Sequence, residues 1–493
     1  MPQNKSHDQF LSIVVIGASG DLAVKKIFPA LFALFCRKLL PESFVCYGYA
    51  RTELNDEAFR MLLMGSLSCR YTPGESECRS LMDAFLSRCH YVSGGYDDPL
   101  GLLRLKSVME SQEQHDLPVT RLFYLSVPPF LFLPTAQSLK EAGMAEEIPE
   151  KQKLRVVVEK PFGRDRQSSD ALTRDLRHVF TEEQSYRIDH YLGKEVVQNL
   201  MALRFANLIF EPIWNRNNIH YIRFCWSEDI GTEGRAGYFD HYGIIRDVMQ
   251  NHLLQMLALI TMEEPLSLEP EQVRNEKVKA LRAVQPVRFE DMVIGQYTEA
   301  NYKGQVQKGY LQETGVPADS ITPTYGAAIL KLRNRRWDGV PFLLSAGKGL
   351  NTRRTGIHIE FRHVPGNIFT ANSSPVPNSL RIRVQPDAGV SLNIMTKVPG
   401  LRMSLEKTEL DLSYASAFKE EIPDAYESLL LDVIQGDKSL FIRADELEAA
   451  WDIFTPVLHD LEGCAIKPQP YPFGSAGPDS AGALAALYNA EWA

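Results

Sequence analysis

The stretch LSIVVIGASGDLA, residues 11–23, decides the fold of the N-terminal part of the chain. Its first six residues form a short apolar run rich in β-branched side chains, which is typical of a strand buried on both faces of a parallel sheet. Gly17 and Gly20 follow directly, and apolar residues at helical spacing continue to about Leu34. The stretch therefore predicts a strand, a glycine turn and a helix.

Three further runs, residues 44–49, 121–127 and 154–158, have the same strand-like character, and an amphipathic helical pattern separates the last two. Strands that alternate with helices predict a parallel sheet with helices on its faces. A chain of 493 residues is also too long to fold around a single hydrophobic core, so two domains are expected. We therefore expect residues 1–186 to form a doubly wound α/β domain of the Rossmann type.

Beyond residue 186 the pattern changes. Helical spacing at 194–206 and 243–262 gives way to alternating runs, which are IHYIRFCWS (219–227), TGIHIEFRHV (355–364), LRIRVQP (380–386) and VSLNIMT (390–396). Alternation is typical of antiparallel strands with one face on a core. We expect residues 187–493 to form a larger α+β domain with a big, mostly antiparallel sheet. The tail from Tyr471 is rich in Gly, Ala and Pro, and we expect it to be the least regularly folded part.

Composition excludes several classes of protein. The net charge of −9 argues against nucleic-acid binding, because such proteins usually carry a basic excess. There is no uninterrupted apolar run of 18 residues, so we expect no membrane span, and the N-terminus lacks the features of a signal peptide. The cytoplasm is the default expectation.

The seven cysteines are irregularly spaced and contain no CxxC pair, which predicts neither a disulfide framework nor a zinc site. A reducing compartment fits this usage best. For Cys69, Cys78 and Cys89 we favour free, scattered thiols, although a regulatory disulfide among them stays open.

The glycine turn suits a dinucleotide. Glycines let the backbone approach a pyrophosphate, and the free N–H groups at the helix start stabilise its charge. Arg51 follows the second strand, where an enzyme that uses NAD usually has an acidic residue. An arginine there can pair with a 2′-phosphate, so NADP is favoured. An ordinary turn and a solvated arginine are the alternatives.

The stretch VVVEKPFG, residues 156–163, places Glu159, Lys160 and Pro161 at the carboxyl end of a predicted strand, where open α/β sheets bind ligands. Proline restricts Lys160 to extended backbone, and the Lys160–Pro161 bond can be trans or cis. A strand end with a surface lysine is the alternative interpretation.

The stretch RIDHYLGKE, residues 187–195, reads as an irregular segment that runs into a helix near Gly193. His190, Tyr191 and Lys194 together could hold a phosphate by charge-assisted hydrogen bonds. Gly193 would let the helix start close to that phosphate. Solvated charges at an ordinary helix start are the alternative.

On an α-helical wheel of residues 237–262, His252 lies on one stripe with Ile245, Met249, Met256 and Ile260. A histidine in such a stripe is usually a satisfied core residue. The functional alternative is a general base, which needs a carboxylate to fix its tautomer. Asp189 can serve only if the two segments meet in space.

The motifs GASGDLA, EKPFG, RIDHYLGKE, GTEGR and RDVMQNH together resemble the glucose-6-phosphate dehydrogenase family. The resemblance runs from about residue 13 to about residue 474, through KGLNTRR, IRVQP, IPDAYE and IFTP. It implies oxidation of D-glucose 6-phosphate at C1 to 6-phospho-D-glucono-1,5-lactone with hydride transfer to NADP, the first step of the oxidative pentose phosphate pathway. It also implies a homodimer or homotetramer formed through the sheet domain.

The resemblance implies roles for individual residues. His252 would be the general base and Asp189 its orienting carboxylate. The coenzyme site would comprise Gly17, Ala18, Ser19, Gly20, Asp21, Leu22, Arg51 and Lys160. The substrate site would comprise Lys160, His190, Tyr191, Lys194, Glu228, Asp247, Lys348, Arg353 and Gln385. No metal is expected, because the coenzyme carries the redox step.

Some positions depart from the family pattern. At a second, structural NADP site found in some members, Arg354, Arg383 and Asp411 match, whereas Ser345, His358, Asn393 and Ala476 replace basic residues and Ser391 replaces a tyrosine. We expect that site to be empty or degraded. In the coenzyme domain, Phe132 replaces an NADP-contacting tyrosine found in some members.

Two other functions stay open. The first is another NADP-dependent Rossmann sugar dehydrogenase, which would lack the HYxxK set. The second is a catalytically silent NADP-sensing protein, in which damage to His252, Asp189 or Lys160 is expected.

Overall fold

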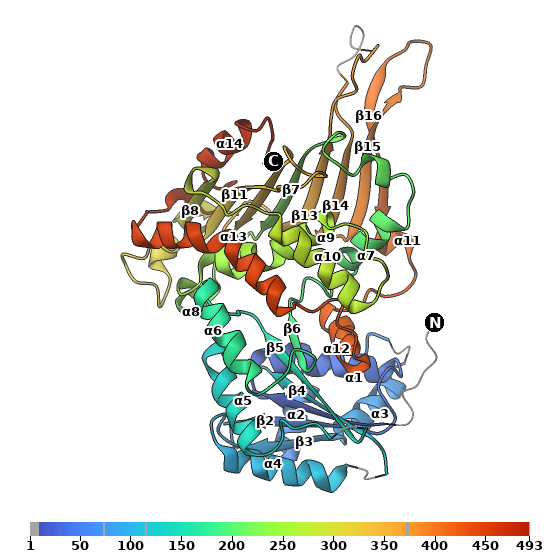
Figure 1. Ribbon diagram of the computed structural model, residues 1–493, viewed down its shortest axis with the longest axis vertical. Helices are drawn as coiled ribbons and strands as arrows, with labels where there is room; N and C mark the ends of the chain where they lie inside the picture. Colours follow the sequence, from blue (N-terminus) through green and yellow to red (C-terminus); the bar gives the residue numbers. More distant parts are fainter. Residues whose placement is uncertain (1–8, 72–73, 114–115, 149, 370–374, 493) are drawn as a thin grey trace.

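The computed structural model describes residues 9–71, 74–113, 116–148, 150–369 and 375–492. The N-terminal sheet and its helices form one part, and a larger sheet with its own helices forms the other (Figure 1). No helix within the described residues is both long enough and apolar enough to cross a membrane.

The N-terminal part contains a six-stranded parallel sheet with strand order β3-β2-β1-β4-β5-β6. This order is that of a Rossmann fold, as expected. All seven residues of β1 are buried, which explains its unbroken apolar run. The strands are β1 (Phe10–Ile16), β2 (Phe44–Ala50), β3 (Cys89–Ser93), β4 (Val119–Leu125), β5 (Gln152–Glu159) and β6 (Ser185–Ile188).

The connections between these strands are helical. The glycine turn after β1 enters a short π-helix, η2, which continues as α1. The helices of this part are η2 (Ala23–Ile27), α1 (Phe28–Cys36), α2 (Asp56–Met64), α3 (Glu75–Leu86), α4 (Pro99–Gln112), η3 (Pro129–Leu131), α5 (Phe132–Glu141) and α6 (Arg166–Arg177).

The larger part contains a nine-stranded sheet with order β16-β15-β14-β13-β7-β12-β11-β8-β17. Its pairs are antiparallel except β7–β12 and β8–β17, so the expected mostly antiparallel sheet is confirmed. The strands are β7 (Ile219–Ser227), β8 (Met292–Thr298), β11 (Tyr325–Lys331), β12 (Pro341–Gly347), β13 (Arg354–Phe361), β14 (Ser379–Gln385), β15 (Gly389–Lys397), β16 (Leu405–Ser413) and β17 (Gln469–Pro472), with a hairpin of β9 (Ala300–Tyr302) and β10 (Gln305–Gln307).

Helices cover one face of this sheet, with α9, α10 and α13 in front of it in Figure 1. The helices of this part are α7 (Glu195–Phe205), η4 (Glu211–Ile213), α8 (Ala236–Asp240), η5 (Ile245–Leu253), α9 (Leu254–Thr261), α10 (Pro270–Arg282), η6 (Phe289–Asp291), η7 (Tyr310–Gln312), α11 (Tyr414–Ala417), α12 (Ala425–Gln435), α13 (Ala444–Gly463) and α14 (Asp479–Ala486).

The segment that carries His252 is not a plain α-helix. Residues 245–253 form the π-helix η5, and only from Leu254 does the segment become α-helical, as α9. The α-helical wheel is therefore the wrong template for this segment, although its expected stripe is buried at every position. π-helical turns are rare and frequently lie at functional sites.

The C-terminal tail, expected to be the least regularly folded part, contains regular elements. β17 pairs in parallel with β8 as the edge of the large sheet, and α14 follows it. Leu484 and Ala485 of α14 share an apolar cluster with Tyr221 and Leu343 of the sheet, and Tyr488 and Trp492 pack against that cluster. These contacts hold the tail on the sheet.

The expectation of free thiols is wrong for two cysteines. Cys69 and Cys78 form a disulfide with a Cα–Cα distance of 5.8 Å, whereas Cys89 is a buried free thiol. Spacing alone did not indicate this pair, because both cysteines lie in a polar segment outside any recognised motif.

The two parts of the chain are joined by more than one connection. β6 spans the expected boundary at residue 186, so the domain limits stay a prediction. α12, from late in the sequence, lies against α1 (Figure 1). Lys26 forms an ion pair with Asp424 at 3.1 Å, and Arg70 forms one with Glu427 at 2.9 Å.

Candidate active site

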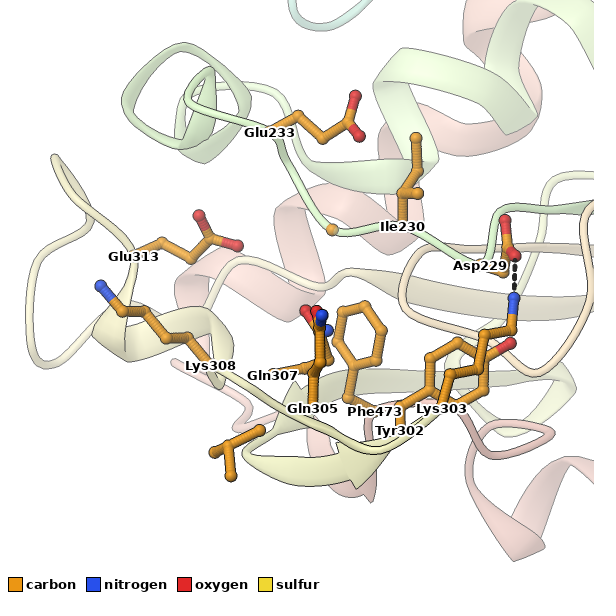
Figure 2. Close-up of a pocket in the computed structure, with 12 residues that line it drawn as sticks. Asp229, Ile230, Glu233, Tyr302, Lys303, Gln305, Gln307, Lys308, Glu313 and Phe473 are labelled. Atoms are coloured by element: carbon orange, nitrogen blue, oxygen red, sulfur yellow. Dashed lines mark hydrogen bonds and ion pairs between the residues drawn. The ribbon is translucent and has the colours of Figure 1, made fainter.

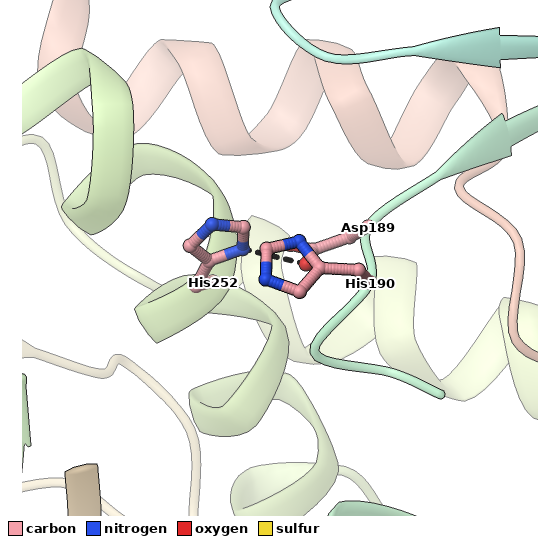
Figure 3. A group of neighbouring side chains, drawn as sticks. All are labelled: Asp189, His190 and His252. Carbon is pink, nitrogen blue, oxygen red and sulfur yellow. Dashed lines mark hydrogen bonds and ion pairs between the residues drawn. The ribbon is translucent and has the colours of Figure 1, made fainter. Parts of the chain in front are cut away.

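Asp189 and His252 meet in space. Asp189 follows β6 and His252 lies on η5, and Figure 3 shows the two side chains facing each other. The distance from His252 Nδ1 to Asp189 Oδ1 is 2.5 Å, and the side chains are 3% and 1% exposed. The backbone N–H of Tyr191 donates to the same carboxylate oxygen at 2.9 Å. The contact on which the general-base hypothesis depended is therefore present.

Burial sets the charges of this pair. Burial is the largest cause that lowers the pKa of His252 below its ordinary value, and it outweighs the attraction of Asp189. Burial also raises the pKa of Asp189, but His252, His190 and the Tyr191 N–H hold it at about 2. A neutral imidazole beside a carboxylate must carry its proton on Nδ1, so Nε2 keeps a free lone pair. This is the state of a general base.

His190 completes this cluster (Figure 3). Its ring lies edge-on to that of His252, with centroids 4.8 Å apart. Ligand atoms of Asp189, His190 and His252 lie within 4.8 Å of one another, which would also suit a metal ion by residue type. The oxygen of Asp189 and Nδ1 of His252 already bond to each other, and the described geometry is that of an oriented base.

Tyr191 and Lys194 of RIDHYLGKE contact the large sheet. Lys194 Nζ donates to Gln385 Oε1 at 2.9 Å, and burial lowers the pKa of its ammonium group. The Tyr191 hydroxyl accepts from Trp226 at 2.6 Å, and its ring stacks on His252. Burial lowers the pKa of His190 well below its ordinary value, so His190 would contact an anion as a neutral donor.

Two ion pairs flank the His252 cluster. Lys160 Nζ donates to the carboxylate and the backbone carbonyl of Asp247 at 2.8 and 2.7 Å, and the Lys160–Pro161 bond is cis. Burial raises the pKa of Asp247, but Lys160 holds it at about 2. Lys348 Nζ donates to Glu228 at 2.6 Å.

Arg353 is the most exposed member of the expected substrate set. Its charge contributes to lowering the pKa of Lys194, which places it near the same group of residues. The structure therefore brings the substrate-site residues that the sequence indicated to one region between the two parts of the chain.

The glycine turn has the geometry that a nucleotide needs. Gly17 has φ of +88°, and a Cβ there would collide with the backbone carbonyl of Ser126. Its N–H donates to Tyr49 O at 2.7 Å. Ser19 Oγ lies 3.0 Å from Thr52 Oγ1, beside Arg51 at the end of β2.

Arg51 is exposed, and its guanidinium lies 5.3 Å from the centre of the Tyr96 ring. A cation held over an aromatic ring keeps its donors available to an anion. Asp21 is also exposed, where it pairs with Lys25 at 2.9 Å.

Sequence reasoning missed part of this region. Glu159 was noted within EKPFG without a role, and Tyr426 was noted only as part of IPDAYE. The Tyr426 hydroxyl donates to Glu159 at 3.2 Å, and its ring lies parallel to that of His190. A tyrosine 236 positions after His190 gives no local signal of that contact.

A separate pocket lies on the large-sheet part of the chain. It has a volume of about 550 Å³ between the β9–β10 hairpin and the loop after β7 (Figure 2). Its wall includes Tyr302, Phe473 and the ion pair of Lys303 with Asp229 at 2.9 Å. None of the expected site residues lines this pocket, so volume alone does not identify the active site.

Comparisons with known proteins match both parts of the chain. Residues 14–199 match the family model described as glucose-6-phosphate dehydrogenase, NAD binding domain. Residues 201–493 match the model described as glucose-6-phosphate dehydrogenase, C-terminal domain. The two matches together span nearly the whole chain.

Similar proteins span nearly the whole chain as well. A chloroplastic glucose-6-phosphate 1-dehydrogenase of Arabidopsis thaliana is 52% identical over 98% of this chain and 83% of its own length. A cytoplasmic one from the same plant is 46% identical over 96% and 90%. Since relatives of both compartments match, the cytoplasmic location stays a prediction.

Solved structures agree with the sequence relatives. A glucose-6-phosphate dehydrogenase in complex with its substrate glucose-6-phosphate is 42% identical, covers 99% of both chains and has a TM-score of 0.92. The enzyme of Mycobacterium avium is 34% identical, covers 97% of both chains and has a TM-score of 0.79. This chain belongs to the glucose-6-phosphate dehydrogenase family.

Proposed function

We propose that this chain oxidises D-glucose 6-phosphate at C1 to 6-phospho-D-glucono-1,5-lactone and transfers the hydride to NADP. The observation that carries the proposal is the buried pair of His252 and Asp189, 2.5 Å apart, beside a cluster of cationic and hydroxyl-binding residues. The similarity of this chain to a glucose-6-phosphate dehydrogenase solved in complex with glucose-6-phosphate supports the choice of substrate.

The geometry suits proton removal. His252 Nε2 takes the proton of the C1 hydroxyl while the C1–H bond breaks and its electron pair leaves as hydride. Asp189 then stabilises the imidazolium, because its carboxylate already bonds to Nδ1. A base positioned in this way contributes about 10²- to 10⁴-fold to the rate. NADP, when bound, supplies the hydride acceptor.

The other residues bind and orient the sugar. Lys194, His190 and Tyr191 suit the phosphate, because they combine one ammonium with neutral donors. Glu228 and Asp247, each held by a lysine, are acceptors for sugar hydroxyls. Binding energy from the distant phosphate can thereby fix C1 against the base.

The residues present fit NADP. The turn at Gly17 excludes a Cβ, which would let a pyrophosphate approach the backbone, and the exposed guanidinium of Arg51 after β2 could pair with a 2′-phosphate. We infer that a second, structural NADP binds weakly or not at all. His358 pairs with Glu360 at 3.0 Å, and Arg383 pairs with Asp411 at 2.6 Å. Two side chains at the position of that second site therefore already have acidic partners.

Replacement of Arg51 by alanine should raise the KM for NADP about 10- to 100-fold, because a hydrogen-bonded charge contact to the 2′-phosphate is lost. The KM for NAD should stay unchanged, since NAD has no such phosphate. Initial rates with each coenzyme measure both values. An equal rise in the KM for NAD and in the KM for NADP would contradict the assignment. Arg51 would then stabilise the glycine turn and not bind the 2′-phosphate.

The pH dependence follows from the neutral state of His252. Burial lowers its pKa below 6.5, so the base form persists at neutral pH and is lost as the pH falls through that lowered pKa. We expect kcat/KM to be level around neutrality and to fall about tenfold per pH unit only at pH values below the lowered pKa of His252. A rate already halved at neutral pH would contradict the lowered pKa.

One assay tests the function and its alternatives. Reduction of NADP is followed by absorbance with glucose 6-phosphate and, separately, with unphosphorylated glucose. The proposal expects rapid reduction with the phosphorylated sugar alone. Reduction with glucose itself would favour another sugar dehydrogenase, and NADP binding without any reduction would favour a sensing protein. Light scattering of the same preparation tests the expected homodimer or homotetramer.

A further inference from the structure

The carboxylate of Glu159 links the two parts of the chain next to the phosphate-binding residues. It stands at the end of β5 and is 9% exposed. Its Oε1 accepts from the Tyr124 hydroxyl of β4 at 2.6 Å and from the Tyr426 hydroxyl of α12 at 3.2 Å. One carboxylate oxygen thus accepts hydrogen bonds from Tyr124 of the N-terminal sheet and from Tyr426 of α12, which lies late in the sequence.

The ring of Tyr426 also contacts the ring of His190. The two rings are nearly parallel, with an interplanar angle of 6° and centroids 6.2 Å apart, and His190 in turn lies against His252. α12 itself packs closely against Gly193 of the same segment, where a Cβ would collide with Ala425 O. The position of the tyrosine ring therefore depends on its hydroxyl and on the docking of α12.

The environment of Glu159 argues for a dedicated acceptor. The neighbouring Lys160 donates to Asp247, and among the residues that the structure describes no cation forms an ion pair with Glu159. Lys160 acts on Glu159 only through its charge. Burial raises the pKa of Glu159, while the two tyrosine hydroxyls oppose that rise. A buried carboxyl is costly unless it is hydrogen-bonded, and here the bonds go to two tyrosines rather than to a salt-bridge partner.

We propose that Glu159 is a positioning residue for substrate binding, which holds the Tyr426 ring against His190 and so sets the phosphate end of the site. The proposal rests on the proposed function, because it assigns the affected step to glucose 6-phosphate. Glu159 itself does not touch the reacting atoms. Its effect should appear in KM rather than in kcat.

The test compares four variants by steady-state kinetics. Glu159→Ala and Tyr426→Phe should each raise the KM for glucose 6-phosphate about tenfold, since small misplacements of binding groups are costly, with kcat within about threefold of the wild type. Glu159→Gln should restore a KM near the wild-type value, because its amide oxygen still accepts from both hydroxyls. The KM for NADP should not change in any of them.

Tyr124→Phe is the matched control. It removes the other hydroxyl from the same carboxylate oxygen without touching His190, so it should lower Tm as Tyr426→Phe does and leave KM unchanged. Equal KM effects of the two tyrosine variants, an unchanged KM in Glu159→Ala, or a raised KM in Glu159→Gln would each overturn the proposal. A wild-type protein that does not reduce NADP would overturn the proposed function and this proposal together.

Discussion

Replacement of His252 by asparagine should lower kcat by about 10²- to 10⁴-fold, the contribution of a positioned general base. The amide can still donate to Asp189, so the buried carboxylate keeps a partner and the fold is retained. It offers no basic nitrogen to the C1 hydroxyl. Binding of glucose 6-phosphate should stay near the wild-type value, since the phosphate residues are unchanged.

Turnover and calorimetric binding measure these two effects separately. His241→Asn makes the same change at an exposed histidine a few residues before η5 and should leave both values unchanged. A His252→Asn protein that turns over within about tenfold of the wild type would remove His252 from the role of base. The buried pair would then be a structural hydrogen bond.

Replacement of Lys277 by methionine should lower the free energy of unfolding by about 3–5 kcal/mol. Lys277 of α10 and Glu446 of α13 form a buried ion pair at 2.9 Å, with side chains 1% and 0% exposed. Neither carboxylate oxygen of Glu446 has a conventional hydrogen-bond partner in the described structure. Loss of the ammonium would leave a charge without compensation in the helical layer of the large sheet.

Urea unfolding of the variant measures this loss. Lys279→Met, two residues along the same helix, removes an ammonium that is 62% exposed and pairs with Glu276. That control should cost less than about 1 kcal/mol. The double variant Lys277→Met, Glu446→Leu should recover most of the stability, because it removes both charges. A loss as small for Lys277→Met as for Lys279→Met would contradict the role of the buried pair.

Much of the fold was predictable because its signals are local. An unbroken run such as that of β1 requires burial on both faces, and alternation such as that of β14 requires one buried face. β3 and β6 escaped prediction because they are short and their residues are not uniformly apolar. The Cys69–Cys78 disulfide escaped because pairing depends on Cα separation in space and not on spacing along the chain.

The motifs proposed the members of the candidate site, and they did not predict how these residues are arranged in space. The sequence could name Asp189 and His252, but it could not show that the loop after β6 meets a π-helix 63 positions later. Gly193 illustrates the same limit. A Cβ there would collide with Ala425 O of α12, so packing requires this glycine, whatever lies near the phosphate.

The sequence by itself determined the Rossmann sheet, the large antiparallel sheet and the residue types of the site, because periodicity and turn chemistry act over a few residues. Only the tertiary structure decided that Asp189 bonds to His252, that Tyr426 lies against His190, and that Glu159 bonds to two tyrosines. These contacts join residues tens to hundreds of positions apart. They form because packing of the helices against the sheets brings those residues together. No local sequence pattern predicts such contacts.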